Sequence, residues 1–140
     1  KKNIIEQDEF DQDIRNIMNY GHTFGHAIEA ATQYAIPHGI AVTIGMDMAN
    51  YIAYHHNLCS KLHFERMHVT LKKNYDHFVN YPIPIQPFLL AIAKDKKNVG
   101  KNNISAILPD KKSVLTKLRV ENNEFFQKKC GEYLNLGRLL

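Results

Sequence analysis

The segment from His38 to His55 constrains the fold most, because it is apolar around most of its circumference when it is drawn as a helix. A helix that is apolar on most sides is buried by its neighbours. We therefore expect a helix that starts at His38 or Gly39, ends near His55 and lies at the centre of the domain. Its apolar residues include Ile40, Val42, Ile44, Met46, Met48, Ile52 and Ala53.

Apolar residues also recur at helical spacing before and after this segment. From Phe10 to about Thr32 they predict two helical pieces, broken or kinked near Gly21, because glycine weakens a helix. Ser60 is a suitable N-cap for a helix over residues 61–74. The face of that helix is expected to carry Leu62, Met67, Leu71 and Tyr75.

The second half of the chain predicts two shorter helices and a hairpin. A connector with three prolines precedes a helix from Phe88 to Lys94, and residues 95–103 form a basic loop. Short β-like runs at residues 104–108 and 113–120 flank the turn at residues 109–112. A last helix begins near Asn122 or Asn123 and carries Phe125, Phe126, Tyr133 and Leu134. The fold class is mainly α, with one small hairpin.

Length and composition exclude several classes of protein. The chain has 140 residues, enough for one domain with a substantial core, and its net charge is +4. Its lysines are scattered in pairs and are not interleaved with aromatic residues, so we expect no nucleic-acid partner. No apolar run is long enough for a membrane span, and two cysteines without a CxxC pair fit a reducing cytoplasm.

Three histidines form the most informative pattern. His22 and His26 are four residues apart and share a helical face, and His38 follows a proline turn that brings the chain back toward them. Neutral imidazoles bind zinc well, so this arrangement is a candidate metal site. A solvated or hydrogen-bonded histidine pair remains an alternative at this point.

The neighbours of these histidines favour a site for an anionic substrate. Gly21 and Gly25 flank His22 on a helix, where glycine is costly unless another group approaches the backbone closely. Arg15 and Asn19 share the face of His22 if the helix persists through Gly21, and arginine binds phosphate or carboxylate with two hydrogen bonds. The alternative is a core helix that carries a few polar groups.

The segments RNIMNYGHTFGHAIEA and PHGIAVTIGM closely resemble the signature of the 3-dehydroquinate synthase and sugar-phosphate cyclase family. The family pattern is R-x-x-L-N-x-G-H-T-x-G-H-A-I-E, followed after a short loop by H-G-E-A-V-x-x-G-M. The later DKKN and ISAILP segments are also similar, so the resemblance covers almost the whole chain. It implies the multi-helix C-terminal domain of the dehydroquinate synthase-like fold, with the NAD-binding domain absent from this chain.

The resemblance also implies roles for individual residues. His22 and His38 would be metal ligands, to Zn2+ or Co2+, and the third ligand would be a glutamate outside this sequence. Arg15, Asn19 and His26 would contact the substrate, with His26 near its phosphate end and able to relay protons.

Further substrate contacts are implied by two other segments. Asp11 stands where the family usually has glutamate, and either Lys96 or Lys97 would reach the anionic groups of the substrate. Two departures limit the comparison, because Ile40 replaces the glutamate of HGEAV and Asp13 replaces a common glycine.

The implied reaction is the metal- and NAD-dependent cyclisation of 3-deoxy-D-arabino-heptulosonate 7-phosphate to 3-dehydroquinate, with elimination of phosphate. The resemblance implies a homodimer for the full-length protein, and we expect the isolated fragment to be inactive. The alternatives are a cyclase for another heptulose or hexose phosphate, a non-catalytic dimerisation or binding module, and a metal-sensing domain that uses the three histidines alone.

The other histidines and the cysteines are assigned no function. His55, His56, His63, His68 and His77 are expected at the surface, because their spacing does not suit a second metal site. Cys59 and Cys130 are expected to be buried, small apolar residues and not nucleophiles.

Overall fold

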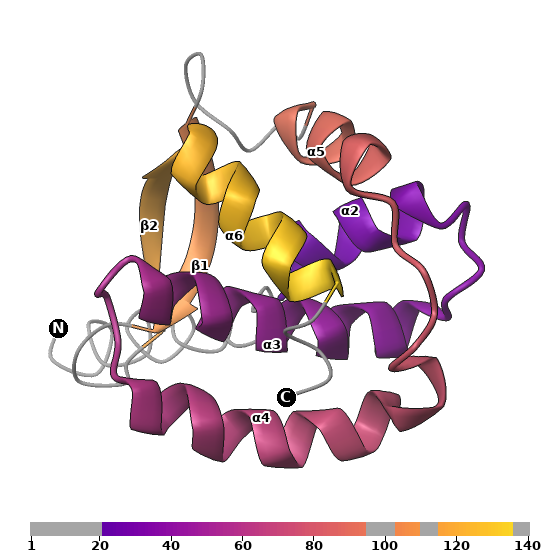
Figure 1. Ribbon diagram of the computed structural model, residues 1–140, viewed down its shortest axis with the longest axis horizontal. Helices are drawn as coiled ribbons and strands as arrows, with labels where there is room; N and C mark the ends of the chain where they lie inside the picture. The colour runs from indigo at the N-terminus through magenta and orange to yellow at the C-terminus, as the bar shows by residue number, and fades with distance from the viewer. Residues whose placement is uncertain (1–20, 95–102, 110–114, 136–140) are drawn as a thin grey trace, which may run out of the picture.

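The chain folds into helices joined to one antiparallel hairpin, as the sequence predicts. The structure is a computed structural model that describes residues 21–94, 103–109 and 115–135. Figure 1 shows the arrangement of the elements. In chain order they are α2 (His22–Ala31), α3 (His38–His55), α4 (Lys61–Tyr75), the 3-10 turn η1 (Asp76–Phe78), α5 (Ile85–Ala93), β1 (Asn103–Pro109), β2 (Leu115–Glu121) and α6 (Glu124–Asn135).

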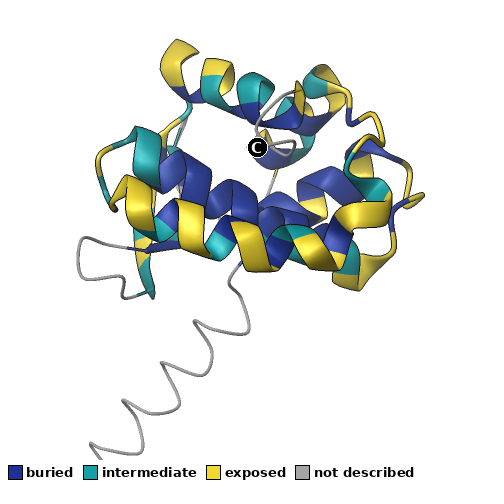
Figure 2. Cartoon of the chain, turned by 60° about the horizontal axis from the view of Figure 1, so that its bottom comes forward, coloured by how far each residue is buried: buried dark blue, intermediate teal, exposed yellow. Residues whose placement is uncertain are grey.

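Helix α3 lies at the centre of the fold. It packs against α2, α4, α6 and β1, and in Figure 1 it crosses the middle of the molecule between α4 on one side and α2, α6 and the hairpin on the other. Figure 2 shows the contrast in burial between α3 and the outward face of α4. The predicted central helix is therefore confirmed, and it begins at His38.

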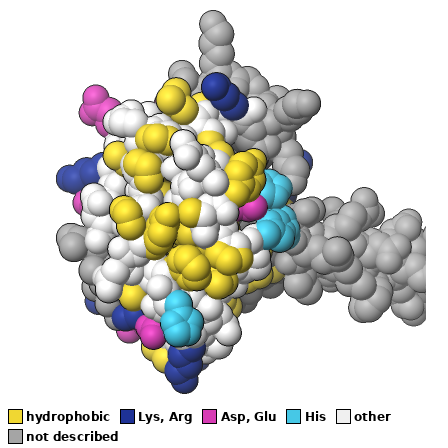
Figure 3. Space-filling view, turned by 90° about the vertical axis from the view of Figure 1, so that its right-hand side faces the viewer, with side chains coloured by type: hydrophobic (Ala, Val, Ile, Leu, Met, Phe, Trp, Pro, Cys, Tyr) yellow, Lys and Arg dark blue, Asp and Glu magenta, His cyan; other side chains and the backbone are white. Residues whose placement is uncertain are grey.

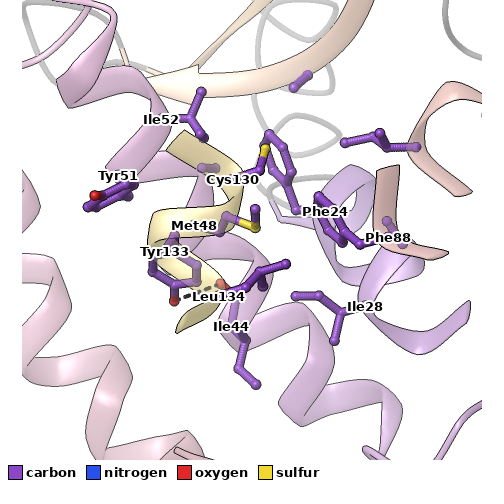
Figure 4. Packing of buried hydrophobic residues seen from close by; sticks show 14 of the residues in the cluster. Phe24, Ile28, Ile44, Met48, Tyr51, Ile52, Phe88, Cys130, Tyr133 and Leu134 are labelled. Atoms are coloured by element: carbon purple, nitrogen blue, oxygen red, sulfur yellow. Dashed lines mark hydrogen bonds between the residues drawn. The ribbon is translucent and has the colours of Figure 1, made fainter. Parts of the chain in front are cut away.

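The apolar core joins side chains from four helices, as Figure 4 shows. Phenylalanines from α2 and α5, Phe24 and Phe88, are both fully buried. Helix α3 contributes Ile44, Met48 and Ile52, and α6 contributes the side chains of Phe126, Cys130 and Leu134. Burying this apolar surface is the main favourable term in folding, so α2 and α3 are held by the core that lies behind the histidines.

Helix α4 begins where it was predicted, and two of the four residues predicted on or near one face, Leu71 and Tyr75, are buried. The hydroxyl of Ser60 accepts a hydrogen bond from the amide of His63 at 3.1 Å, which caps the helix. Leu62, which was predicted on or near the same face as Leu71 and Tyr75, is 55% exposed and lies outside the buried stripe. The buried residues recur four, three and four positions apart and therefore share one stripe of the helix. They are Phe64, His68, Leu71 and Tyr75.

The expected surface position of His68 was also wrong, because His68 belongs to a buried polar network around Asp47. The Nδ1 atom of His68 lies 2.8 Å from Oδ2 of Asp47, and the hydroxyls of Tyr75 and Tyr133 each donate to the same oxygen at 2.7 Å. All four side chains are buried. The network connects α3, α4 and α6, and a buried carboxylate is tolerated only when such donors satisfy it.

The shorter elements were predicted with small errors in their ends. Helix α5 starts at Ile85, before the expected Phe88, because Pro87 lies in the first turn, where no backbone N–H is needed. Strands β1 and β2 pair antiparallel, with Ile104 opposite Val120. The turn at residues 110–114 and the basic loop at residues 95–102 lie outside the described residues. Asn123 caps α6 by accepting a hydrogen bond from the amide of Phe126 at 2.9 Å. Among the described helices, none combines the length and apolar character needed to cross a membrane.

Candidate metal and substrate site

The three histidines singled out in the sequence converge at the corner between α2 and α3. The ring centroid of His22 lies 5.4 Å from that of His26 and 5.6 Å from that of His38, and the His26 and His38 centroids are 6.1 Å apart. In Figure 3, histidine side chains lie together at the surface with an acidic side chain beside them. His26 and His38 are exposed and His22 is half-buried, so the cluster is open to a ligand.

Three glycines let α2 and α3 approach closely enough to bring these rings together. Gly21 precedes α2 with a φ of 82°, a left-handed conformation that glycine adopts without strain. A Cβ atom on Gly45 would lie only 2.2 Å from the carbonyl oxygen of Gly21, and one on Gly25 would lie 3.0 Å from the Cα atom of Val42. The predicted second helical piece therefore begins directly after Gly21, while the first piece lies outside the described residues.

Glu29 adds a carboxylate to the histidine cluster. Its Oε1 atom lies 2.9 Å from Nδ1 of His38. The glutamate side chain is 12% exposed and the histidine side chain is 59% exposed. Glu29 was not among the predicted site residues, although it follows His22 by seven positions and His26 by three. That spacing places all three on one helical face and is the signal that was missed.

The described residues fit one divalent metal ion. Two imidazoles bound to one tetrahedral ion, with bonds of roughly 2 Å, have ring centroids roughly 5 Å apart. The observed distances of 5.4 and 5.6 Å from His22 are close to this value. His26, Glu29 and His38 each offer a ligand atom, and these atoms all lie within 4.8 Å of one another. Nitrogen and carboxylate donors of this kind suit zinc and cobalt.

A small cavity adjoins the cluster between α2 and α5. It has a volume of about 230 Å³, and its polar lining comes from Thr23, His26 and Lys94. Lys94 is the C-cap of α5 and lies just before the predicted substrate residues Lys96 and Lys97. The cavity is therefore lined by both a cation and an exposed imidazole, which suits an anionic group of a small substrate.

The other predicted substrate residues lie outside the described residues. Asp11, Arg15 and Asn19 precede residue 21, and Lys96 and Lys97 fall in the basic loop. Their roles stay predictions. The two cysteines are buried as predicted. Burial raises the pKa of the Cys59 thiol to about 11, which argues against a nucleophile at that position.

The sequence matches one family of known proteins. Residues 1–98 match the family described as 3-dehydroquinate synthase C-terminal. Similar proteins include the 3-dehydroquinate synthase of Dictyoglomus thermophilum, 42% identical over 110 residues, and that of Helicobacter pylori strain HPAG1, 44% identical over 111 residues. Each alignment covers 78% of this chain and 30% or 32% of the relative. The chain thus spans about a third of the length of these relatives.

Solved structures share the fold as well. A 2-deoxy-scyllo-inosose synthase complexed with carbaglucose-6-phosphate, NAD+ and Co2+ superimposes with a TM-score of 0.63 at 26% identity. The superposition covers 85% of this chain and 34% of that one. A second 2-deoxy-scyllo-inosose synthase structure gives a TM-score of 0.62 at 27% identity, covering 83% of this chain and 32% of the other. The helical fold described above is therefore that of the sugar-phosphate cyclases.

Proposed function

The chain belongs to the 3-dehydroquinate synthase C-terminal family, and we propose that residues 1–140 form the helical metal- and substrate-binding domain of a sugar-phosphate cyclase. The observation that carries the proposal is the convergence of His22, His26 and His38 on an open corner of the fold. A solvated histidine pair on α2 would not account for the third ring, because His38 comes from a different helix. The domain would work with an NAD-binding domain supplied by the rest of a longer protein.

The reaction that we propose is the conversion of 3-deoxy-D-arabino-heptulosonate 7-phosphate to 3-dehydroquinate with loss of phosphate. This is a carbon–oxygen lyase step of the shikimate pathway, which leads to aromatic amino acids. It would take place in the cytoplasm, in a homodimer of the full-length protein. Support for the reaction comes from the relatives named 3-dehydroquinate synthase, which are 42% and 44% identical to this chain.

The family resemblance implies that His22 and His38 would hold the metal, and their rings, which come from different helices, lie 5.6 Å apart. A bound Zn2+ or Co2+ ion would supply Lewis-acid polarisation of a substrate oxygen, and bound NAD would supply reversible hydride transfer. The protein then needs no strong base of its own. Its task is to fix the substrate, because correct orientation lowers the barrier by itself.

The remaining site residues would bind and orient the anionic substrate. Arg15 and Lys96 or Lys97 would neutralise its carboxylate and phosphate, and Asn19 would orient a hydroxyl group. His26 is exposed beside the cavity that Lys94 also lines, so it can hold or move a proton at the phosphate-bearing end. Asp11 would add a further polar contact to the substrate.

The direct test is phosphate release by the full-length gene product, supplied with NAD, zinc and 3-deoxy-D-arabino-heptulosonate 7-phosphate. Release that disappears in the His22→Ala variant supports both the reaction and the metal role. The 140-residue chain assayed alone is expected to show no turnover, since it spans about a third of its relatives. A folded full-length protein that binds NAD and zinc but releases no phosphate contradicts the proposed substrate.

A second candidate substrate is a hexose or another heptulose phosphate. Two observations favour it. Ile40 stands two residues after His38, where the family pattern has glutamate, and a structural neighbour was solved with carbaglucose-6-phosphate. Phosphate release from glucose 6-phosphate or sedoheptulose 7-phosphate, without release from the first substrate, would select this alternative. Ile40→Glu is then the first variant to make.

A further inference from the structure

The buried carboxylate of Glu29 has one hydrogen-bond partner among the described residues, and that partner is exposed. Oε1 lies 2.9 Å from Nδ1 of His38, across the turn that joins α2 to α3. The glutamate side chain is 12% exposed, compared with 59% for the histidine. Removing a carboxylate from water is costly unless a donor satisfies it, so this contact is needed to keep Glu29 in place.

The contact fixes which nitrogen of His38 carries the proton. An ionised carboxylate only accepts hydrogen bonds, so the neutral imidazole must donate from Nδ1. The lone pair is then left on Nε2, at the opposite edge of the ring. Histidines that bind metals commonly donate their other N–H to a carboxylate, which orients the ring and makes the ligating nitrogen more basic.

We propose that Glu29 is a positioning residue, which acts through His38 to hold its Nε2 atom ready for the metal ion. This inference rests on the proposed function, because it takes His38 as a metal ligand. Glu29 was not among the residues predicted from the sequence to form the site. The role also explains why a carboxylate is buried at the end of α2, where it contributes nothing to the apolar core.

The local backbone shows why His38 needs such a partner. His38 is the first residue of α3, and the turn before it contains Gln33 and Tyr34 with positive φ values of 53° and 63°. The backbone of this turn places the Cα atom of His38 but does not set its side-chain torsion angles. With more than half of its side chain exposed, His38 would otherwise sample several rotamers.

A direct ligand role for Glu29 fits the distances less well. Ligand atoms on a tetrahedral zinc ion are roughly 3.3 Å apart, given bonds of roughly 2 Å. The distance of 2.9 Å between Oε1 and Nδ1 is that of a hydrogen bond. Oε1 of Glu29 and Nδ1 of His38 are therefore hydrogen-bonded to each other, and Nε2 of His38 is the nitrogen left for the metal.

The test uses the full-length gene product and two substitutions of different severity. Glu29→Gln keeps an oxygen acceptor of similar shape, whereas Glu29→Ala removes the acceptor. Glu65→Ala is the matched control, because Glu65 is an exposed carboxylate on α4 that pairs only with Lys61 at 3.7 Å in the described part of the chain. Zinc affinity is measured by competition with a chromophoric chelator, and the His38 tautomer is read from its imidazole 15N chemical shifts in the metal-free protein.

The expected result separates positioning from simple structural support. Glu29→Ala should weaken zinc binding about 10- to 100-fold and convert His38 from the Nδ1–H tautomer to a mixture. Glu29→Gln should keep that tautomer and stay within roughly threefold of wild-type affinity, as should Glu65→Ala. A merely structural role would lower the thermal midpoint of the metal-free Glu29→Ala protein without changing the tautomer.

Several results would overturn the inference. One is an Nε2–H tautomer of His38 in the wild-type protein, and another is an unchanged zinc affinity in Glu29→Ala. A third is a loss of zinc affinity of roughly 1,000-fold or more in Glu29→Ala, which would identify Glu29 as a direct ligand. A wild-type protein that binds no zinc would instead contradict the proposed function. The two failures are therefore distinguishable.

Discussion

Replacing Gly45 with alanine should separate α2 from α3 and damage both the stability and the metal site. The added Cβ atom would lie 2.2 Å from the carbonyl oxygen of Gly21 and 2.7 Å from the amide nitrogen of Gly25. Both are backbone atoms of the α2 segment, so no flexible side chain can move aside. The helices must separate until the shorter distance grows from 2.2 Å to at least 3.0 Å.

The expected cost follows from two opposing effects. Overpacking a tightly packed interior costs about 1–3 kcal/mol, and a clash with backbone belongs at the upper end of that range. Alanine gains about 1 kcal/mol over glycine in helix propensity. The net loss in the free energy of unfolding is therefore about 2 kcal/mol, a large share of the 5–15 kcal/mol of a typical domain.

Urea unfolding followed by far-ultraviolet circular dichroism measures this loss as a lower midpoint at an unchanged slope. Gly39→Ala is the matched control in the same helix, because a Cβ atom there would meet nothing within 4 Å. It should leave stability unchanged or raise it slightly. A Gly45→Ala protein as stable as the wild type, or a Gly39→Ala protein equally destabilised, would refute the packing argument.

Three further predictions concern the core and the titrating groups. Tyr133→Phe removes one of the hydrogen bonds to buried Asp47 and should cost about 1–3 kcal/mol in urea unfolding; an unchanged midpoint would show that the network adds no stability. Burial raises the pKa of Cys59 to about 11, so its thiol should react slowly with Ellman's reagent at pH 8 until urea is added, and rapid reaction of the folded protein would contradict this. Burial lowers the pKa of His55 and His63 below 6.5, so the unfolded state binds protons more readily than the folded state. The thermal midpoint should therefore fall as the pH drops below 6.5, and it should fall less in the variant with both histidines replaced by glutamine. An equal fall in that variant would mean that other groups cause the pH dependence.

The sequence predicted the parts of the fold that depend on local signals. The apolar circumference of α3 placed it at the centre, and the hydroxyl of Ser60 marked the start of α4. The errors came from interactions between elements. The buried position of His68 depends on Asp47, which is 21 positions earlier in the sequence, and nothing in the spacing within α4 reveals that pair.

The candidate site was predicted in the same uneven way. His22, His26 and His38 could be grouped from the proline turn between the two helices, and the structure brings them together. Glu29 was missed because its partner lies nine positions away across a turn, and the geometry of that turn depends on the left-handed residues Gln33 and Tyr34. Helical spacing alone identified the face of α2 but not the role of each side chain on it.

The central claim is that this domain holds a catalytic metal ion at the corner between α2 and α3. The most direct measurement is an anomalous difference map, collected at the zinc absorption edge from crystals of the full-length gene product grown with zinc. We predict one strong peak roughly 2 Å from a ring nitrogen of both His22 and His38. A peak elsewhere in the chain, or no peak at the α2–α3 corner at saturating zinc, would contradict the account.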